Sequence, residues 1–213
     1  MLNSQTMNKT IIIILLSLLV TKINGQINFL NPCDDWNNKI EQIKKYNEDF
    51  NKALSFEFDE AYLIRFIAKP SFEPEYAFQI EKVMNNTFRL KVILFQENLW
   101  YSRNRDSIKV YTYEKKINKT LAIQLDSLFN KTTSSAITKE NLIVGGIDGE
   151  TYYFSRKSES GIMNCGQCWS PSNSTPLFEL VDICKTLFDY AKMEIVDIAG
   201  LNDRIKKLYD IIE

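Results

Sequence analysis

Residues 76–96, YAFQIEKVMNNTFRLKVILFQ, decide the fold of this chain, because they contain two strand-like segments around a turn. Apolar and aromatic residues dominate Tyr76 to Val83 and Thr87 to Gln96, as is typical of buried strands. The intervening pair Asn85-Asn86 tolerates the positive φ that a tight hairpin requires. The stretch therefore predicts an antiparallel β-hairpin near the middle of the chain.

Further strands and helices are predicted on both sides of this hairpin. The later half of Phe56–Ala68 reads as a strand that Lys69-Pro70 ends, since proline cannot donate to a sheet ladder. Asp148-Gly149 is a strong signal for a hairpin turn. The other predicted elements are helices over 36–54, 121–129, 177–191 and 201–212, strands over 108–116, 142–147 and 150–156, and a polar loop over 157–175.

The order of these elements indicates an α+β fold. Strands joined by short connections pair antiparallel, so we expect a mainly antiparallel sheet of about five to six strands with helices packed on one face. Residues 26–213 are expected to form a single globular domain with a C-terminal helical extension over about 193–213. The apolar side of the last helix either packs back on the domain or waits for a partner.

The N-terminus has the pattern of a secretory signal peptide. Lys9 precedes a block from Ile11 to Val20 that is apolar except for Ser17, and a polar segment follows. This block is about half as long as the roughly 20 residues that a membrane-spanning helix needs. We therefore predict a signal peptide over 1–25 and an exported protein, periplasmic or extracellular, with no membrane span after cleavage.

Composition excludes several classes of function. The chain contains no histidine, which excludes Ser-His-Asp triads, Cys-His pairs and histidine-based zinc sites. Loss of Lys9 and Lys22 with the signal peptide lowers the basic count from 26 to 24 against 27 acidic residues, a formal net charge of −3. A nucleic-acid surface requires a clustered positive field, so we expect no nucleic-acid partner, and we identify no metal or cofactor. The neighbouring acids Glu73 and Glu75 read as solvated charge rather than as a catalytic pair.

The four cysteines are expected to form structural disulfides, because exported proteins generally oxidise their thiols. Of the three possible pairings, the favoured one joins Cys165 to Cys168 and Cys33 to Cys184. A zinc site of four thiolates is the competitor, although Cys33 and Cys184 each stand alone. The C-x-x-C motif at 165–168 also suggests a redox enzyme, with Cys165 as nucleophile and Cys168 as resolving thiol. That chemistry needs the first cysteine at a helix N-terminus, and the next predicted helix begins several residues later.

Aromatic and arginine side chains provide the candidate binding residues. Such side chains dominate the energetics of protein interfaces, and an exposed turn between two strands carries Trp100, Tyr101, Arg103 and Arg105. Trp169 in its polar loop is a further candidate. The alternative is that these rings fold back and cover the edge of the sheet.

A stretch near the C-terminus resembles a tail found in small exported proteins of Bacteroidetes-type bacteria for which no activity is known. The resemblance covers 147–187 and rests on Asp148-Gly149-Glu150-Thr151-Tyr152-Tyr153-Phe154, on Trp169-Ser170-Pro171 and on Leu180-Val181-Asp182-Ile183-Cys184-Lys185. It implies a hairpin, a loop closed by the Trp-Ser-Pro turn, a helix on the sheet and export. Cys165 and Cys168 depart from the pattern, which suggests an additional local disulfide.

The favoured hypothesis is an exported, non-enzymatic binding or interaction protein for an unknown protein or small ligand. Its expected contact surface comprises the strands over 142–147 and 150–156, Trp169 and the Trp100 turn. The first alternative is a thiol-disulfide oxidoreductase that uses Cys165 and Cys168. The second is a structural protein that assembles through its C-terminal helix.

Overall fold

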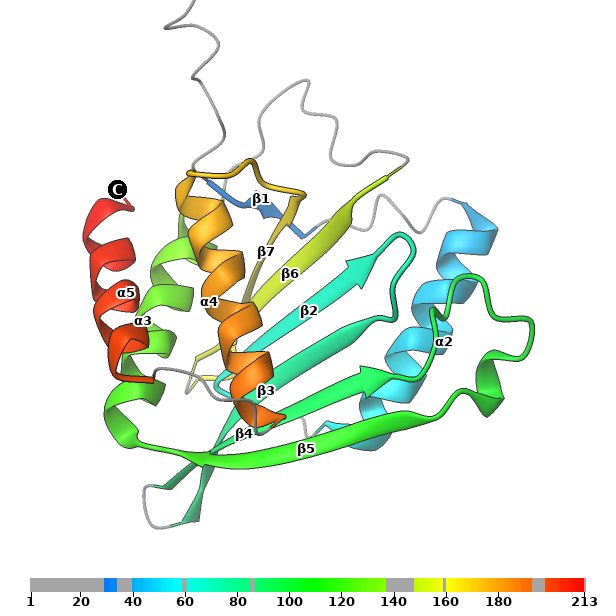
Figure 1. The fold of residues 1–213 in the computed structure, drawn as a ribbon, viewed down its shortest axis with the longest axis horizontal. Helices are drawn as coiled ribbons and strands as arrows, with labels where there is room; N and C mark the ends of the chain where they lie inside the picture. Colours follow the sequence, from blue (N-terminus) through cyan, green and yellow to red (C-terminus); the bar gives the residue numbers. More distant parts are fainter. Residues whose placement is uncertain are drawn as a thin grey trace, which may run out of the picture.

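The computed structural model describes residues 29–33, 40–58, 61–84, 87–136, 148–158, 160–192 and 198–212. The predicted signal peptide, the Asn85-Asn86 turn and the predicted strand over 142–147 lie outside these ranges. The elements are β1 (Asn31–Pro32), α2 (Glu41–Glu57), β2 (Ile64–Pro70), β3 (Tyr76–Val83), β4 (Thr87–Phe95), the short 3-10 helix η3 (Arg105–Ser107), β5 (Val110–Ile117), α3 (Lys119–Ser134), β6 (Glu150–Lys157), β7 (Met163–Trp169), α4 (Pro176–Ala191) and α5 (Ile198–Ile211) (Figure 1).

The strands of the described residues form one seven-stranded antiparallel sheet in the order β1-β7-β6-β2-β3-β4-β5. This confirms the predicted α+β class with a mainly antiparallel sheet, with one strand more than the upper count expected. The sheet places β1, from the N-terminal part of the chain, beside β7 at the edge opposite β5.

The hairpin predicted at 76–96 is present as β3 and β4, with Val83 opposite Thr87 next to the turn. Successive side chains point to opposite faces of the sheet. Phe78 therefore joins the larger hydrophobic core, whereas Ala77 joins a smaller core on the other face. Burial of both faces explains why the two strands are so rich in apolar residues.

Strand β7 was not predicted, because it lies within the expected polar loop over 157–175. Gly166 and the polar residues Asn164 and Gln167 interrupt the apolar pattern typical of a strand. The strand is held by pairing with β6 on one side and β1 on the other. A Cβ atom added at Gly166 would lie 2.7 Å from the Leu30 side chain, so glycine permits this close approach. Long-range pairing thus overrides a weak local preference.

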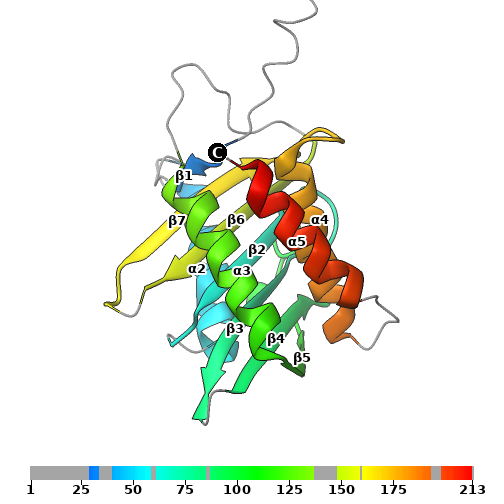
Figure 2. The ribbon, with the colours of Figure 1, turned by 90° about the vertical axis from the view of Figure 1, so that its left-hand side faces the viewer.

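Helices cover both faces of the sheet. Figure 2 shows α3, α4 and α5 in front of the sheet and α2 behind it. On the α2 face, Phe50 and Leu54 pack with Ile93 and Phe95 in the smaller core. The expectation that helices pack on one face therefore holds for α3, α4 and α5 but not for the first helix.

The C-terminal helix α5 packs back on the domain. Leu201, Ile205 and Leu208 are buried in the larger core, where α5 contacts α3 and α4. The helix begins at Ile198, three residues before the predicted start at 201, so Gly200 lies in the first turn of α5.

Candidate functional site

The predicted aromatic turn lies between β4 and β5, and the side chain of Asn98 fixes its backbone. The Asn98 amide nitrogen donates to the carbonyl oxygen of Glu73 at 2.7 Å, and its amide oxygen accepts from the backbone nitrogen of Trp100 at 3.0 Å. This pair of bonds ties the turn to the connection between β2 and β3. Trp100 is thereby presented on a defined backbone with 39% of its surface exposed.

Arg105 connects the turn to α2. Its guanidinium donates to the carbonyl oxygen of Leu99 at 2.9 Å, to that of Trp100 at 3.3 Å and to the Asp49 carboxylate at 3.1 Å. A guanidinium engaged in three such bonds is held in place. Arg105 therefore stabilises the turn, whereas Arg103 is exposed at its rim.

The aromatic side chains of the turn are partly packed and partly exposed. The Trp100 ring meets the Tyr46 ring of α2 edge-on, with centroids 5.3 Å apart. Tyr101 stacks on Phe72 at 6.2 Å, and these two rings are 59% and 62% exposed. The turn thus combines both expected behaviours, because the rings pack against the domain and still offer apolar surface to solvent.

Two clefts share Trp100 as a wall. The first, with a volume of about 470 Å³, lies between α2 and the turn, where Lys45 and Asp49 face Arg103. The second, of about 340 Å³, is bounded by Trp100 and Tyr101 on one side and by Lys69 and Tyr153 of the sheet on the other. The structure therefore brings all four predicted residues of the turn, Trp100, Tyr101, Arg103 and Arg105, to the walls of two adjacent clefts.

Trp169 lies on β7 near the same end of the sheet. It is paired with Thr151, which lines the second cleft. A Cβ atom added at Gly149 would lie 2.6 Å from the Trp169 ring, so the indole covers the Asp148-Gly149 turn. Trp169 is half-buried there. It lines neither of the two clefts, but its pairing partner Thr151 lines the second one.

The second cleft exposes a lysine that sequence reasoning did not identify as a site residue. Lys69 lies at the end of β2, where the sequence indicated only the end of a strand. Its ammonium group lies 5.0 Å from the ring centroid of Tyr46, 4.4 Å from that of Phe50 and 5.4 Å from that of Tyr153. Burial against these rings lowers the pKa of Lys69 to about 8, and the negative charge of Glu75 opposes this shift.

Glu75 was expected to be solvated, and this prediction is wrong. The residue is fully buried beneath the turn. Its carboxylate accepts a hydrogen bond from the Tyr46 hydroxyl at 2.8 Å and another from the backbone nitrogen of Leu99 at 2.8 Å. Burial raises the pKa of Glu75, and the two hydrogen bonds and Lys69 act against the rise. The reason for the error is that the chain re-enters the sheet at Glu75, where α2 and the turn cover it.

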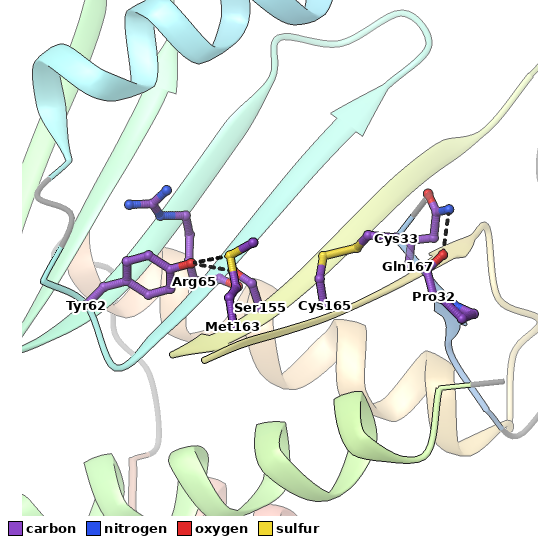
Figure 3. Close-up of a disulfide and its surroundings, with 8 residues drawn as sticks. All are labelled: Pro32, Cys33, Tyr62, Arg65, Ser155, Met163, Cys165 and Gln167. Carbon is purple, nitrogen blue, oxygen red and sulfur yellow. Dashed lines mark hydrogen bonds between the residues drawn. A yellow bond between two sulfur atoms is a disulfide. The ribbon is translucent and has the colours of Figure 1, made fainter. Parts of the chain in front are cut away.

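The disulfide pairing favoured from the sequence is wrong. Cys33 is bonded to Cys165, with their Cα atoms 5.4 Å apart (Figure 3). Cys168 and Cys184 are free and buried. Cys165 and Cys168 are three residues apart on β7, so their side chains point to opposite faces of the sheet. Cys168 faces the larger core, on the side of Cys184 in α4. Cys165 instead points toward the face where β1 brings Cys33 alongside.

The two free thiols are held in their neutral form. Burial raises the pKa of Cys168 to about 12, and burial also holds the pKa of Cys184 well above its usual range. A thiol reacts through its thiolate, so neither sulfur is an effective nucleophile at neutral pH. In addition, Cys165 lies in a strand and not at a helix N-terminus, which removes the usual cause of thiol activation.

We predict that Cys168 and Cys184 react with a thiol reagent only after unfolding. Addition of 5,5′-dithiobis(2-nitrobenzoate) to the native protein at pH 8 should titrate less than about a tenth of a thiol per chain on the time scale on which a small thiol reacts completely. Addition of denaturant should expose two thiols per chain to the reagent. Rapid labelling of either cysteine in the native protein, located by peptide mapping, would contradict this prediction.

No group of three or more acidic or cysteine side chains within the described ranges is arranged to hold a metal ion. Among the described helices, none has the length and apolar character required to cross a bilayer. Comparison of the chain with family models, with curated proteins and with solved structures finds no match.

Proposed function

We propose that this chain is an exported, non-enzymatic binding protein whose contact surface is the Trp100 turn and its two flanking clefts. The observation that carries the proposal is the position of Trp100, a partly exposed indole on a backbone fixed by Asn98 and Arg105, with a cleft on each side. Rigid aromatic side chains contribute contact area at a low entropic cost, which is why they concentrate in binding sites.

The proposed compartment agrees with the chemistry of the chain. The Cys33–Cys165 disulfide joins residues 132 positions apart and is compatible with an oxidising environment. The signal-like segment before Gln26 is the feature that suggests export itself, and the likeness to small exported bacterial proteins belongs to the same proposal.

The clefts favour a partner that combines an apolar group with polar groups. The first cleft presents charges of both signs, from Lys45 and Asp49 on α2 and Arg103 on the turn. The exposed pair Phe72 and Tyr101 adds apolar surface beside the second cleft. A peptide segment or a small organic ligand with an aromatic or planar group suits this combination.

Two observations count against the rival functions. An oxidoreductase that cycles between Cys165 and Cys168 would need the two sulfur atoms to approach each other, but they lie on opposite faces of β7. Self-assembly through the C-terminal helix would need its apolar side to be accessible, but Leu201, Ile205 and Leu208 are buried within the domain.

Replacement of Trp100 tests the proposal. Parent protein is immobilised and exposed to the secreted and periplasmic fractions of the source cells, and retained proteins and small molecules are identified by mass spectrometry. Trp100→Ala should weaken retention of the specific partner by about 30-fold, the loss expected for a binding hot spot worth about 2 kcal/mol.

Tyr209→Ala is the matched control, because Tyr209 is also 39% exposed but lies on α5 across the sheet. This variant should retain the partner as the parent does. Equal retention by the parent and by Trp100→Ala, with both proteins folded by circular dichroism, would show that the contact surface lies elsewhere.

A further inference from the structure

Lys69 is the reactive group that the second cleft contains. It is the next-to-last residue of β2, and strand alternation places it on the same face as Ile67, toward α2. Its neighbours in the cleft include Thr151 and Tyr153 on β6, and Trp100 and Tyr101 form the opposite wall. Lys69 therefore lines the cleft that a ligand would enter beside Trp100.

The amine has few polar partners for a charged group. Its nitrogen donates to the side-chain oxygen of Asn47 at 2.8 Å, and its other near neighbours are the faces of Tyr46, Phe50 and Tyr153. Ring faces attract a cation, but they replace water poorly as a source of hydrogen bonds. The site thus holds the amine in a partly dehydrated environment.

The charges around Lys69 do not offset this dehydration. Glu75 is the nearby carboxylate, and its two oxygens already accept hydrogen bonds from Tyr46 and Leu99. Burial raises the pKa of Tyr46, so this side chain adds no charge at physiological pH. The Arg105 guanidinium, 5.7 Å from the Tyr46 ring centroid, adds positive charge nearby. Dehydration is therefore the dominant effect on the amine, and the neutral form is accessible.

We infer that Lys69 captures a carbonyl compound, an aldehyde with an aromatic or planar apolar body, as an imine in the cleft beside Trp100. The neutral amine attacks the carbonyl carbon, the C–N bond forms, and a proton moves from nitrogen to oxygen to give a carbinolamine. The hydroxyl group then leaves as water with the remaining proton of that nitrogen, and the nitrogen lone pair forms the C=N bond. Trp100 and Tyr101 pack against the planar body of the ligand. This inference rests on the proposed function, since it names a ligand class for the same clefts.

Reductive trapping with a simple aldehyde tests the inference on the intact protein. Parent protein is incubated at pH 7 with benzaldehyde and sodium cyanoborohydride, which converts an imine into a stable secondary amine, and modified lysines are located by peptide mapping. A pKa of about 8 leaves about a tenth of the Lys69 amine neutral at this pH, against less than about a thousandth for an ordinary lysine. Lys69 should therefore be labelled at least about tenfold faster than other lysines, after allowance for its restricted access.

Lys91 is the internal control. It lies on β4 on the same face of the sheet, with 17% of its side chain exposed, and faces the carboxylates of Glu57 and Glu114 at 4.0 and 3.8 Å. The preference for Lys69 over Lys91 should vanish in urea. Lys69→Arg retains the positive charge and should lose the preferred product. If Lys69 in the native parent reacts no faster than Lys91, the inference is overturned, and that result does not depend on the folding of any variant.

Trp100→Ala separates this inference from the proposed function. If the partner needs Trp100 but Lys69 is not labelled preferentially, the binding site stands and the carbonyl chemistry is wrong. If Lys69 is labelled preferentially and Trp100→Ala leaves partner retention unchanged, the amine site stands and the proposed contact surface is wrong.

Discussion

Replacement of Phe66 by alanine should lower the free energy of unfolding by about 3–5 kcal/mol, the usual cost of removing a fully buried aromatic ring. Phe66 is completely buried on β2, the strand at the centre of the sheet. Its ring centroid lies 5.3 Å from those of Phe78 and Phe154 and 5.8 Å from that of Tyr152. These neighbours belong to strands paired on both sides of β2 and cannot close the cavity without moving the sheet. Urea denaturation followed by circular dichroism measures the change.

Phe72→Ala is the control for this substitution. Phe72→Ala removes the same number of atoms as Phe66→Ala, but the Phe72 ring is 62% exposed. Its replacement should change the free energy of unfolding by less than about 1 kcal/mol, in the range of most surface substitutions. Similar losses for both variants would mean that Phe66 does not lie at the centre of the core.

Removal of the disulfide should have the second-largest effect. Replacing Cys33 and Cys165 together by alanine opens a covalent loop whose ends are 132 residues apart in sequence. The cross-link restricts the unfolded chain, and for a loop of this size we expect the double variant to lose about 2–5 kcal/mol of stability. The difference should appear as a lower urea midpoint relative to the oxidised parent.

A reducing agent provides the control for the double variant. Reduction of the parent should bring its urea midpoint to that of the double variant, whose own midpoint should not respond to the reagent. A Cys33→Ala, Cys165→Ala protein as stable as the oxidised parent would show that this bond does not support the fold.

Local sequence patterns predicted most of the sheet, because most of its strands have a clear apolar pattern. The β3–β4 hairpin was predicted within one residue at each end, since apolar and aromatic residues dominate both strands. Strand β7 was missed because its stability comes from pairing with β1 and β6 and not from its own residues. The position of α2 on the opposite face of the sheet could not be predicted either. An amphipathic pattern shows which side of a helix is buried but not which surface that side packs against.

The candidate site was predicted in part for the same reason. Trp100 and Tyr101 stand out in a sequence as large aromatic residues in a turn. Lys69 and Glu75 do not, because a charged residue normally indicates an exposed position, and their burial depends on α2 and on the turn folding over them. Alternation along β2 offered one usable signal, since it places Lys69 on the same face as Ile67.

The cysteine error follows directly from the missing strand. With 157–175 read as a loop, a bridge between Cys165 and Cys168 was sterically reasonable. Recognition of β7 would have excluded it, because positions three apart in an extended strand face opposite ways. One unrecognised strand therefore changed the predicted connectivity of the whole chain.

The alternation along β7 also constrains how this polypeptide matures. In the newly made, unstructured chain, the closest pair of sulfurs in sequence is Cys165 and Cys168, so random collision favours a small ring between them. That ring is incompatible with the extended backbone that the completed sheet requires. A molecule oxidised in this way must exchange the bond for the one to Cys33 before β7 can take its place. Oxidative maturation is therefore expected to depend on a thiol-exchange catalyst, or on assembly of β6 and β7 before the oxidant arrives.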